Sequence, residues 1–417
     1  MKSSPRQLGL FSATTLVIGN MLGAGIFTTS GYSLAAIQSR EWVLAAWLIG
    51  GVIAMMGAIC YGALARQIPE SGGEYLFLSR TIHPAAGYVG GWLSLFCGFS
   101  APIAFAGLAL GDYTQAWFPS TSPKLVGTIA IIGFAWAQAE RVRLSAPLQN
   151  GLVLLKLLLI GTFLGMAATK IQPAQVILNS QVSLQPFVAS LVWIYLAYSG
   201  WNAAVYVAGE IKDPDTTIPR SLIIGTATVT ILYLSLNTVF LYAAPIDVLA
   251  GETEIAKIAA EALGGKAFAA FVTAIIAIAL LTSISAMTIA GPRVYAKMAN
   301  DGYLPGWFNR SEPPFKASVY LQLVVALLMM WFSGLLQLMT YLGFALGLGA
   351  LLTVVGLIRL RLKDSSITIP GWPWIPFGFV LAIGTITVIT ILESPVECFW
   401  GLVTLSIGVI AWRVQKR

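Results

Sequence analysis

Charged residues are scarce in this sequence. Asp, Glu, Lys and Arg make up 10% of its 417 residues, whereas a soluble protein carries about a quarter. Hydrophobic residues make up 57%, and long runs without charge recur along the whole chain. A helix needs about 20 apolar residues to cross a bilayer. The composition therefore excludes an ordinary soluble domain and predicts an all-α polytopic protein embedded in a lipid bilayer.

Cysteine and histidine are also few. Cys60, Cys97 and Cys398 all lie in or beside apolar segments, so no disulfide framework is expected. The single histidine, His83, lies in a predicted connector, and no apolar segment carries a pair of carboxylates or a metal-ligand spacing. We therefore expect a protein that is not an enzyme and that needs no metal or cofactor.

Twelve spans are predicted, joined by connectors too short for a soluble domain, so residues 1–417 form one domain. With the N-terminus in the cytoplasm, 18 of the 24 Lys and Arg residues fall in inner segments and five in outer segments. This bias predicts that both termini are cytoplasmic. We expect a plasma-membrane protein, of the bacterial inner membrane. Because the basic residues lie between spans, the net charge of +7 does not indicate nucleic-acid binding. The spans run over about 9–36, 42–65, 85–111, 125–139, 146–169, 187–208, 220–243, 267–298, 317–333, 336–358, 374–392 and 396–412.

Glycine interrupts the first predicted span. The stretch IGNMLGAGIF, residues 18–27, places three glycines and the polar Asn20 at mid-span. Backbone can leave the helix at membrane depth only where it lines a cavity or is buried in protein. Transporters built from repeats use pairs of such interrupted spans to bind substrate at the midplane. The sequence should therefore hold a second interruption at a matching position.

Span 6 holds that interruption, because LAYSGWNAAVY places Ser199, Gly200 and Asn202 at mid-span. Five spans separate the two sites, and an odd number of spans per repeat inverts the second copy. We expect a five-plus-five inverted repeat, over about 9–169 and 187–360, with appended helices at about 374–412. Close helix packing through small residues would explain either cluster alone, but two clusters at matching positions favour broken helices 1 and 6.

Opened spans 1 and 6 offer groups for both ends of an α-amino acid. N–H groups at the start of a half-helix suit a carboxylate, and freed carbonyl groups suit an ammonium. We expect Gly25→Val to abolish uptake and to leave stability nearly intact, since glycine permits close approach of the substrate. The predicted substrate-binding residues are Asn20, Met21, Gly23, Ala24, Gly25, Ile26, Leu196, Ala197, Ser199, Gly200 and Asn202.

Four groups of motifs resemble the amino acid–polyamine–organocation superfamily and, within it, the L-type amino acid transporter branch. They are GNMLGAGIF; PESGGEYLFLSR followed by GYVGGW; AYSGWNAAVYVAGEIKDPDTTIPRS; and PRVYAKMANDGYLP, and they cover spans 1 to 8 in order. The resemblance implies a substrate held between spans 1, 3, 6, 8 and 10. Ala24 and Gly25 would donate to its carboxylate, and Met21 and Leu196 would accept from its amine. The branch often has an aromatic gate at Leu196 and serine at Ala24, so this chain departs from it at both positions.

Lys156 is the one basic residue in the middle of a span, about ten residues from either end, or roughly 15 Å from water at 1.5 Å per residue. An ionisable residue at this depth indicates function; a tie between helices is the alternative. The resemblance implies that Lys156 takes the place of sodium in sodium-coupled members. There it would contact the region 23–25 and a span 8 hydroxyl, Ser283 or Ser285. Burial disfavours the charged amine, so a proton remains a candidate coupling partner.

These observations predict a sodium-independent secondary transporter of neutral α-amino acids, either an exchanger or a proton-coupled permease. Glu74, Asp112 and Glu210 lie at span ends or in loops, so no buried carboxylate is expected for a cationic substrate. A cationic amino acid or polyamine transporter or exporter is the alternative. A channel is disfavoured, because it would need a continuous polar stripe along the spans, whereas the polar features here converge at mid-span. Animal members of the branch join a glycoprotein through a cysteine in the outer loop after span 3. Here that loop, 111–124, has none, and no disulfide-linked subunit is expected.

Overall fold

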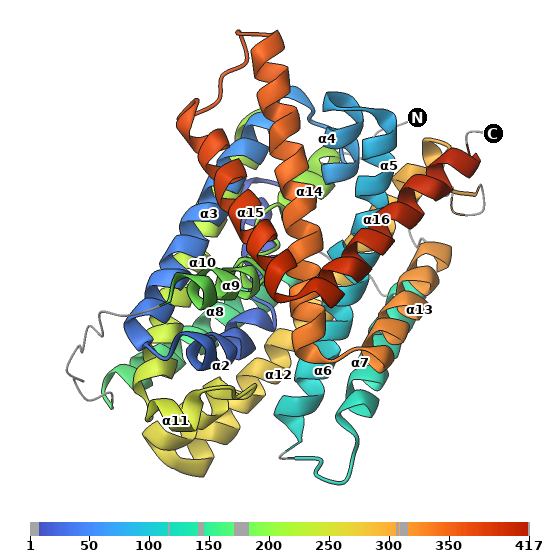
Figure 1. Ribbon diagram of the computed structural model, residues 1–417. Helices are drawn as coiled ribbons and strands as arrows, with labels where there is room; N and C mark the ends of the chain where they lie inside the picture. The colour runs from blue at the N-terminus through green and yellow to red at the C-terminus, as the bar shows by residue number, and fades with distance from the viewer. Residues whose placement is uncertain are drawn as a thin grey trace.

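The computed structural model describes residues 8–115, 117–140, 146–170, 183–305, 308 and 316–415. Its regular elements in these ranges are helices, packed into a bundle (Figure 1). In chain order they are α1 (Leu10–Met21), α2 (Gly25–Ile37), α3 (Arg40–Gln67), α4 (Gly73–Thr81), α5 (Pro84–Leu93), the π-helix η1 (Ser94–Ser100), α6 (Ala101–Thr114), α7 (Pro123–Ala139), α8 (Ala146–Ala168), α9 (Leu184–Ala197), the 3-10 helix η2 (Ala203–Glu210), α10 (Pro214–Tyr242), α11 (Ile246–Leu249), α12 (Ile255–Asn300), α13 (Lys316–Phe332), α14 (Leu335–Lys363), α15 (Trp374–Glu393) and α16 (Pro395–Gln415).

Eight of the described helices are long and apolar enough to cross a membrane, or nine if α1 and α2 form one bent span. The shorter apolar helices α9 and α13 add to these. The elements follow the twelve predicted spans in order, with span 1 built from α1 and α2, span 3 from α5, η1 and α6, and span 6 from α9 and η2. The prediction of a polytopic helical membrane protein is confirmed.

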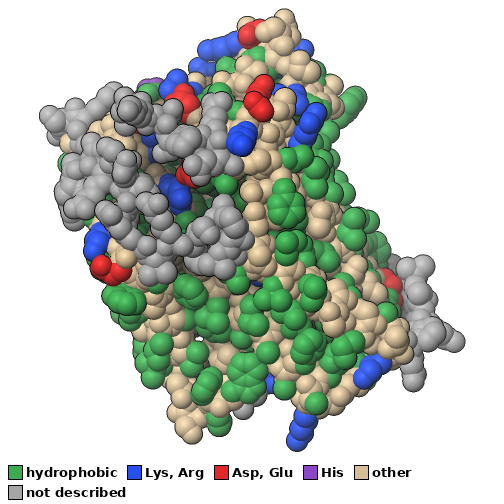
Figure 2. All heavy atoms as spheres, turned by 180° about the vertical axis from the view of Figure 1, so that it is seen from behind, with side chains coloured by type: hydrophobic (Ala, Val, Ile, Leu, Met, Phe, Trp, Pro, Cys, Tyr) green, Lys and Arg blue, Asp and Glu red, His purple; other side chains and the backbone are tan. Residues whose placement is uncertain are grey.

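The surface fits a membrane environment. Hydrophobic side chains spread over the middle of the face in Figure 2, and many of the visible Lys and Arg side chains gather toward its upper end. Both described chain ends lie at the end of the bundle that holds α4 and α5, here called the terminal end, and α11 lies at the opposite end (Figure 1). Seven of the 18 predicted inner basic residues lie outside the described residues: Lys2, Arg6, Arg141, Arg143, Arg310, Lys416 and Arg417.

A widened turn shapes the third span. The π-helical turn η1 ends shortly before Pro102. Proline lacks an N–H group and its ring crowds the carbonyl group four residues earlier, which here belongs to Gly98, so the helix widens at this point. The turn brings Gly98, Phe99 and Pro102 to the wall of a cavity.

The segment 246–266 covers α2 at the end of the bundle opposite the terminal end. The sequence predicts an amphipathic helix with a Gly-Gly stop there. The structure has α11 and the beginning of α12, whose backbone leaves helical geometry at Gly265 (φ 72°). The Gly251 N–H group donates to the Gly31 carbonyl oxygen at 2.8 Å, and the hydroxyl groups of Tyr32 and Thr253 lie 3.0 Å apart. This segment therefore closes over α2, the second half of span 1.

Candidate functional site

Span 1 breaks where its glycines lie. Helix α1 ends at Met21, α2 begins at Gly25, and the two are bent by 41°. The Gly23 N–H group donates to the Met21 carbonyl oxygen at 2.8 Å. Gly23 is among the predicted substrate-binding residues, but its N–H group already has an acceptor within the break. The N–H groups of Ala24, Gly25 and Ile26 lie at the start of α2, where a helix has no acceptors of its own.

Span 6 breaks at the matching place. Helix α9 ends at Ala197, and η2 resumes the helical path at Ala203. Gly200 has a φ of +98°, a conformation that residues with a Cβ rarely adopt. The Ser199 N–H group donates to the Leu196 carbonyl oxygen at 2.8 Å, so that predicted acceptor has a partner within the break.

The two breaks touch each other. A Cβ atom on Gly25 would lie 2.7 Å from the Cα and Cβ atoms of Ala197, and one on Gly200 would lie 2.8 Å from the carbonyl group of Asn20. Only glycine allows approach this close. The expectation that Gly25→Val leaves stability nearly intact is corrected, because the new side chain would collide with span 6.

Tyr233, on α10, connects both breaks, and sequence reasoning missed it. Its hydroxyl group bonds to the carbonyl oxygens of Met21 and Ala197, the latter at 3.0 Å. The sequence left these carbonyl groups without partners, and the structure corrects that. A tyrosine in an apolar span carries no local signal for such a contact, because Tyr233 lies 212 residues from Met21 and 36 from Ala197.

A central cavity lies between the breaks. Eight of the predicted substrate-binding residues line it: Asn20, Met21, Gly23, Ala24, Gly25, Leu196, Ala197 and Ser199. The other lining residues come from spans 3, 8 and 10: Pro102, Phe105, Ala106, Ser283, Met287 and Leu342. Ile26, Gly200 and Asn202 do not line this cavity. The cavity wall therefore combines the start of α2, the end of α9, apolar side chains from spans 3, 8 and 10, and the hydroxyl-bearing residues Ser199 and Ser283.

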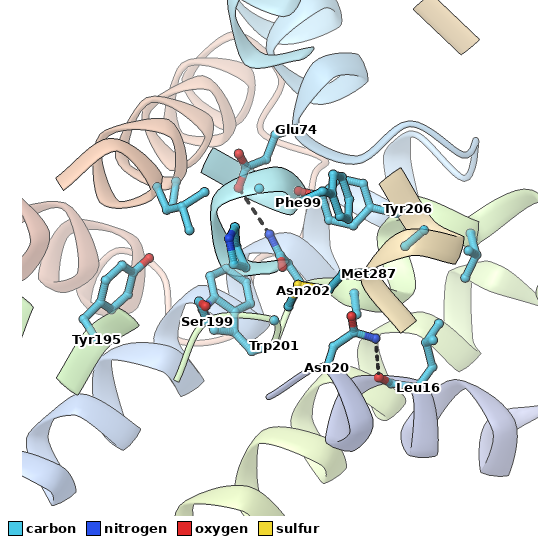
Figure 3. Close-up of a pocket in the computed structure, with 18 residues that line it drawn as sticks. Leu16, Asn20, Glu74, Phe99, Tyr195, Ser199, Trp201, Asn202, Tyr206 and Met287 are labelled. Carbon is cyan, nitrogen blue, oxygen red and sulfur yellow. Dashed lines mark hydrogen bonds between the residues drawn. The ribbon is translucent and has the colours of Figure 1, made fainter. Parts of the chain in front are cut away.

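A second cavity, here called the vestibule, lies toward the terminal end and shares Asn20, Pro102, Ser199 and Met287 with the central cavity. Gly200 and Asn202 line it, and the side chain of Asn202 points toward Glu74 (Figure 3). The Asn20 side chain bonds instead to the Leu16 carbonyl oxygen of its own helix at 2.8 Å.

Glu74 corrects the expectation that no carboxylate is buried near the site. It lies on α4, between the spans α3 and α5, and its side chain is buried in the wall of the vestibule. The carboxylate accepts hydrogen bonds from the Tyr61 hydroxyl group at 2.7 Å and from the Asn202 amide group at 3.2 Å. Burial raises the pKa of Glu74 to about 7. A connector residue enters the site because α4 folds back into the bundle.

Lys156 is buried on α8, and its ammonium group donates to two carbonyl oxygens. One belongs to Leu22 in the break of span 1, at 3.1 Å, and the other to Ala279 on α12, at 3.4 Å. The predicted hydroxyl partner on span 8 is corrected, because the acceptor there is a backbone carbonyl group. Ser285 lines a small cavity beside Lys156, and Ser283 faces Gly23 in the central cavity.

Broken helices in contact around one cavity are what the motifs predict, and the comparison with known sequences agrees. The amino acid permease family matches residues 8–411. The chain belongs to this family. It is a transporter of the amino acid–polyamine–organocation superfamily related to the L-type branch, and its relatives are transporters, not enzymes.

Three relatives represent the matches. The permease is 27% identical to the "Large neutral amino acids transporter small subunit 2" of Rattus norvegicus, over 97% of this chain and 79% of the relative. It is 24% identical to the "Asc-type amino acid transporter 1" of Mus musculus, over 99% and 82%. It is 25% identical to the "Serine/threonine exchanger SteT" of Bacillus subtilis, over 96% of both chains. The family relation therefore extends over nearly the whole chain.

Proposed function

We propose that this permease carries neutral α-amino acids by alternating access, independently of sodium, as an exchanger or as a proton-coupled permease. The observation that carries the proposal is that the start of α2 and the residues Met21 and Ala197 border one cavity. The substrate carboxylate binds the N–H groups of Ala24 and Gly25, and the ammonium approaches the carbonyl groups. A carbonyl oxygen accepts two hydrogen bonds. The Met21 oxygen already accepts from the Gly23 N–H group and from Tyr233, whereas the Ala197 oxygen accepts from Tyr233 and keeps one position for the ammonium.

The cavity wall supports a neutral substrate of small to medium size. Phe105, Ala106 and Leu342 are apolar, and Ser199 and Ser283 supply hydroxyl groups. The names of the relatives, which refer to large neutral amino acids and to serine and threonine, agree with a neutral substrate, and the second name also agrees with a small one.

Lys156 supports sodium independence. Its side-chain nitrogen lies 3.1 Å from the Leu22 carbonyl oxygen, which places a positive charge beside the break of span 1 whenever the amine is protonated. Two unit charges 4 Å apart repel by about 4 kcal/mol at an effective dielectric near 20. A sodium ion at this place would meet that repulsion.

The proposal includes an orientation. With both termini in the cytoplasm of a bacterial cell, the vestibule lies on the cytoplasmic side of the central cavity. The other side is closed by the segment 246–266 and by Tyr113, whose hydroxyl group donates to the Phe27 carbonyl oxygen at 2.5 Å. This arrangement corresponds to a state closed toward the outside. A C-terminal fluorescent protein that matures only in the cytoplasm tests the orientation.

A cationic amino acid or polyamine is the second candidate substrate, and Glu74 is the observation that favours it. A carboxylate in the vestibule wall supplies the acidic group that the sequence appeared to lack. The Glu74 carboxylate does not line the central cavity, so we place it second.

Counterflow in proteoliposomes tests the function. Vesicles loaded with one unlabelled amino acid should accumulate the labelled form, and a scan of the twenty amino acids identifies the substrates. We expect neutral amino acids to exchange equally well in sodium and in choline. Strict dependence on sodium, or exchange of cationic substrates alone, would contradict the proposal.

A further inference from the structure

Glu74 is a buried carboxylate with incomplete hydrogen bonding. Its side chain belongs to a residue that is 5% exposed. The Oε1 atom accepts both hydrogen bonds, from Tyr61 and from Asn202. The Oε2 atom has no hydrogen bond within the described ranges and faces α14, where a Cβ on Gly349 would lie 3.2 Å away. An ionised carboxylate has room for about four hydrogen bonds, and the described residues supply two, so the protein groups alone do not fully stabilise a charge on Glu74.

No cation compensates Glu74 within the described part of the chain. The titratable groups that face it are neutral acids: Tyr61 on α3, Tyr206 on η2 and Tyr195 on α9. Helix α5 presents Gly90 to the backbone of Glu74, and α14 presents Gly349. None of the ion pairs between described residues includes Glu74. An uncompensated buried charge is unfavourable. While the walls of the vestibule pack around Glu74 as they do here, the protonated, neutral form of Glu74 is therefore favoured.

We propose that Glu74 is a proton-binding site of the permease, which holds its proton while the vestibule is packed around it and releases it when water enters. This inference rests on the proposed alternating access. Asn202 lies just before η2, in the break of span 6, and donates to the carboxyl group of Glu74. Loss of the proton creates a charge that requires water, and this favours separation of α4 from span 6. The ligand of this site is a proton, and the site is separate from Lys156.

The test measures opening of the vestibule by thiol labelling. Ala290 lines the vestibule and is absent from the wall of the central cavity, so Ala290→Cys supplies a reporter in the full chain. The three native cysteines are buried, and the chain without the reporter gives the background. The labelling rate with a membrane-impermeant reagent is measured in vesicles that expose the terminal end, in chains with Glu74 and with Glu74→Gln.

At each pH, the labelling rate of the chain with Glu74 is divided by the labelling rate of the chain with Glu74→Gln. This ratio removes the pH dependence of the thiol itself. Glutamine keeps the shape of the neutral acid and cannot ionise. We expect the ratio to rise about tenfold from pH 6 to pH 8, since a group with a pKa of about 7 changes from mostly protonated to mostly ionised over that range. A flat ratio overturns the proposal.

Two variants separate titration from a structural role. Glu70→Gln changes an exposed acid paired with Arg80 at 3.4 Å and should leave the rise intact. Tyr61→Phe removes a hydrogen bond that lowers the pKa of Glu74, so the midpoint of the rise in the labelling ratio should move to higher pH. A midpoint that does not move contradicts titration of Glu74.

Substrate assays distinguish this proposal from the proposed function. Free lysine, added as a substrate, could protect the reporter from labelling. If Glu74→Gln removes that protection and leaves the pH dependence of the labelling rate unchanged, the carboxylate binds an ammonium group and the proton site is overturned. If the wild-type chain exchanges no neutral amino acid but keeps the rise in labelling, the proton site stands and the proposed substrate class fails.

Discussion

The backbone of Gly200 lies against the backbone of Asn20. A Cβ atom on Gly200 would lie 2.8 Å from both the carbonyl carbon and the carbonyl oxygen of Asn20. The two residues belong to the two interrupted spans, which are far apart in the sequence. Their contact makes the two breaks one packed unit, so a change in either break is expected to act on both.

Gly200→Ala should lower both stability and transport. Its φ of +98° is unfavourable for alanine, and the added Cβ would overlap the carbonyl group of Asn20. We expect a loss of at least about 2 kcal/mol, measured as a lower melting temperature in detergent, together with a loss of exchange. Gly161→Ala is the matched control, because a Cβ there meets open space. Wild-type melting and exchange in Gly200→Ala would contradict the contact.

Tyr233→Phe should loosen the link between the breaks with little change in packing volume. The variant removes the hydroxyl group that bonds to the carbonyl oxygens of Met21 and Ala197. Leaving a buried acceptor without its donor costs about 1–3 kcal/mol. We expect a lower melting temperature and a slower exchange rate. Tyr32→Phe removes a hydroxyl group that bonds to Thr253, outside the central cavity, and should affect exchange less. Equal exchange rates in the two variants would count against a role for Tyr233 at the site.

Lys156→Met should lower the transport rate more than it lowers substrate affinity. Methionine fills much of the same buried space but removes the donor to the carbonyl groups of Leu22 and Ala279. We expect the exchange rate to fall about tenfold or more, as a loss of at least 1.4 kcal/mol in coupling would produce, while equilibrium binding changes less. Exchange over a range of external pH separates a titrating lysine from a fixed tie. If the exchange rate of the wild-type chain depends on pH and Lys156→Met abolishes this dependence, titration of Lys156 is supported. If Lys156→Met leaves the exchange rate unchanged, Lys156 is neither a titrating group nor a tie that transport requires.

The permease should run as a single chain on a non-reducing gel from its native membrane. The loop 111–124 contains no cysteine, and Cys60, Cys97 and Cys398 are buried. A disulfide to another subunit needs an accessible thiol. A covalent heterodimer that separates on reduction would refute this prediction.

Local sequence was enough to locate both breaks. Glycines with Asn20 in span 1, and Ser199 with Gly200 in span 6, weaken a helix wherever they occur. Close helix packing would explain one such cluster, but two at matching positions indicated broken helices. The sequence also singled out Lys156, because a charged residue in a long apolar run is energetically costly and therefore indicates a function. Each of these signals is carried by neighbours along the chain, so the sequence displays it directly.

What the sequence could not determine depends on contacts between distant segments. Glu74 appeared to be a connector residue until α4 placed it against Asn202, 128 residues away. Gly25 appeared to make room only for a substrate, whereas Ala197 already lies against it. The carbonyl groups of Met21 and Ala197 appeared unpartnered until α10 brought Tyr233 to them. In each case the chemistry of the residue was plain, but its partner was chosen by helix packing, which no local pattern encodes.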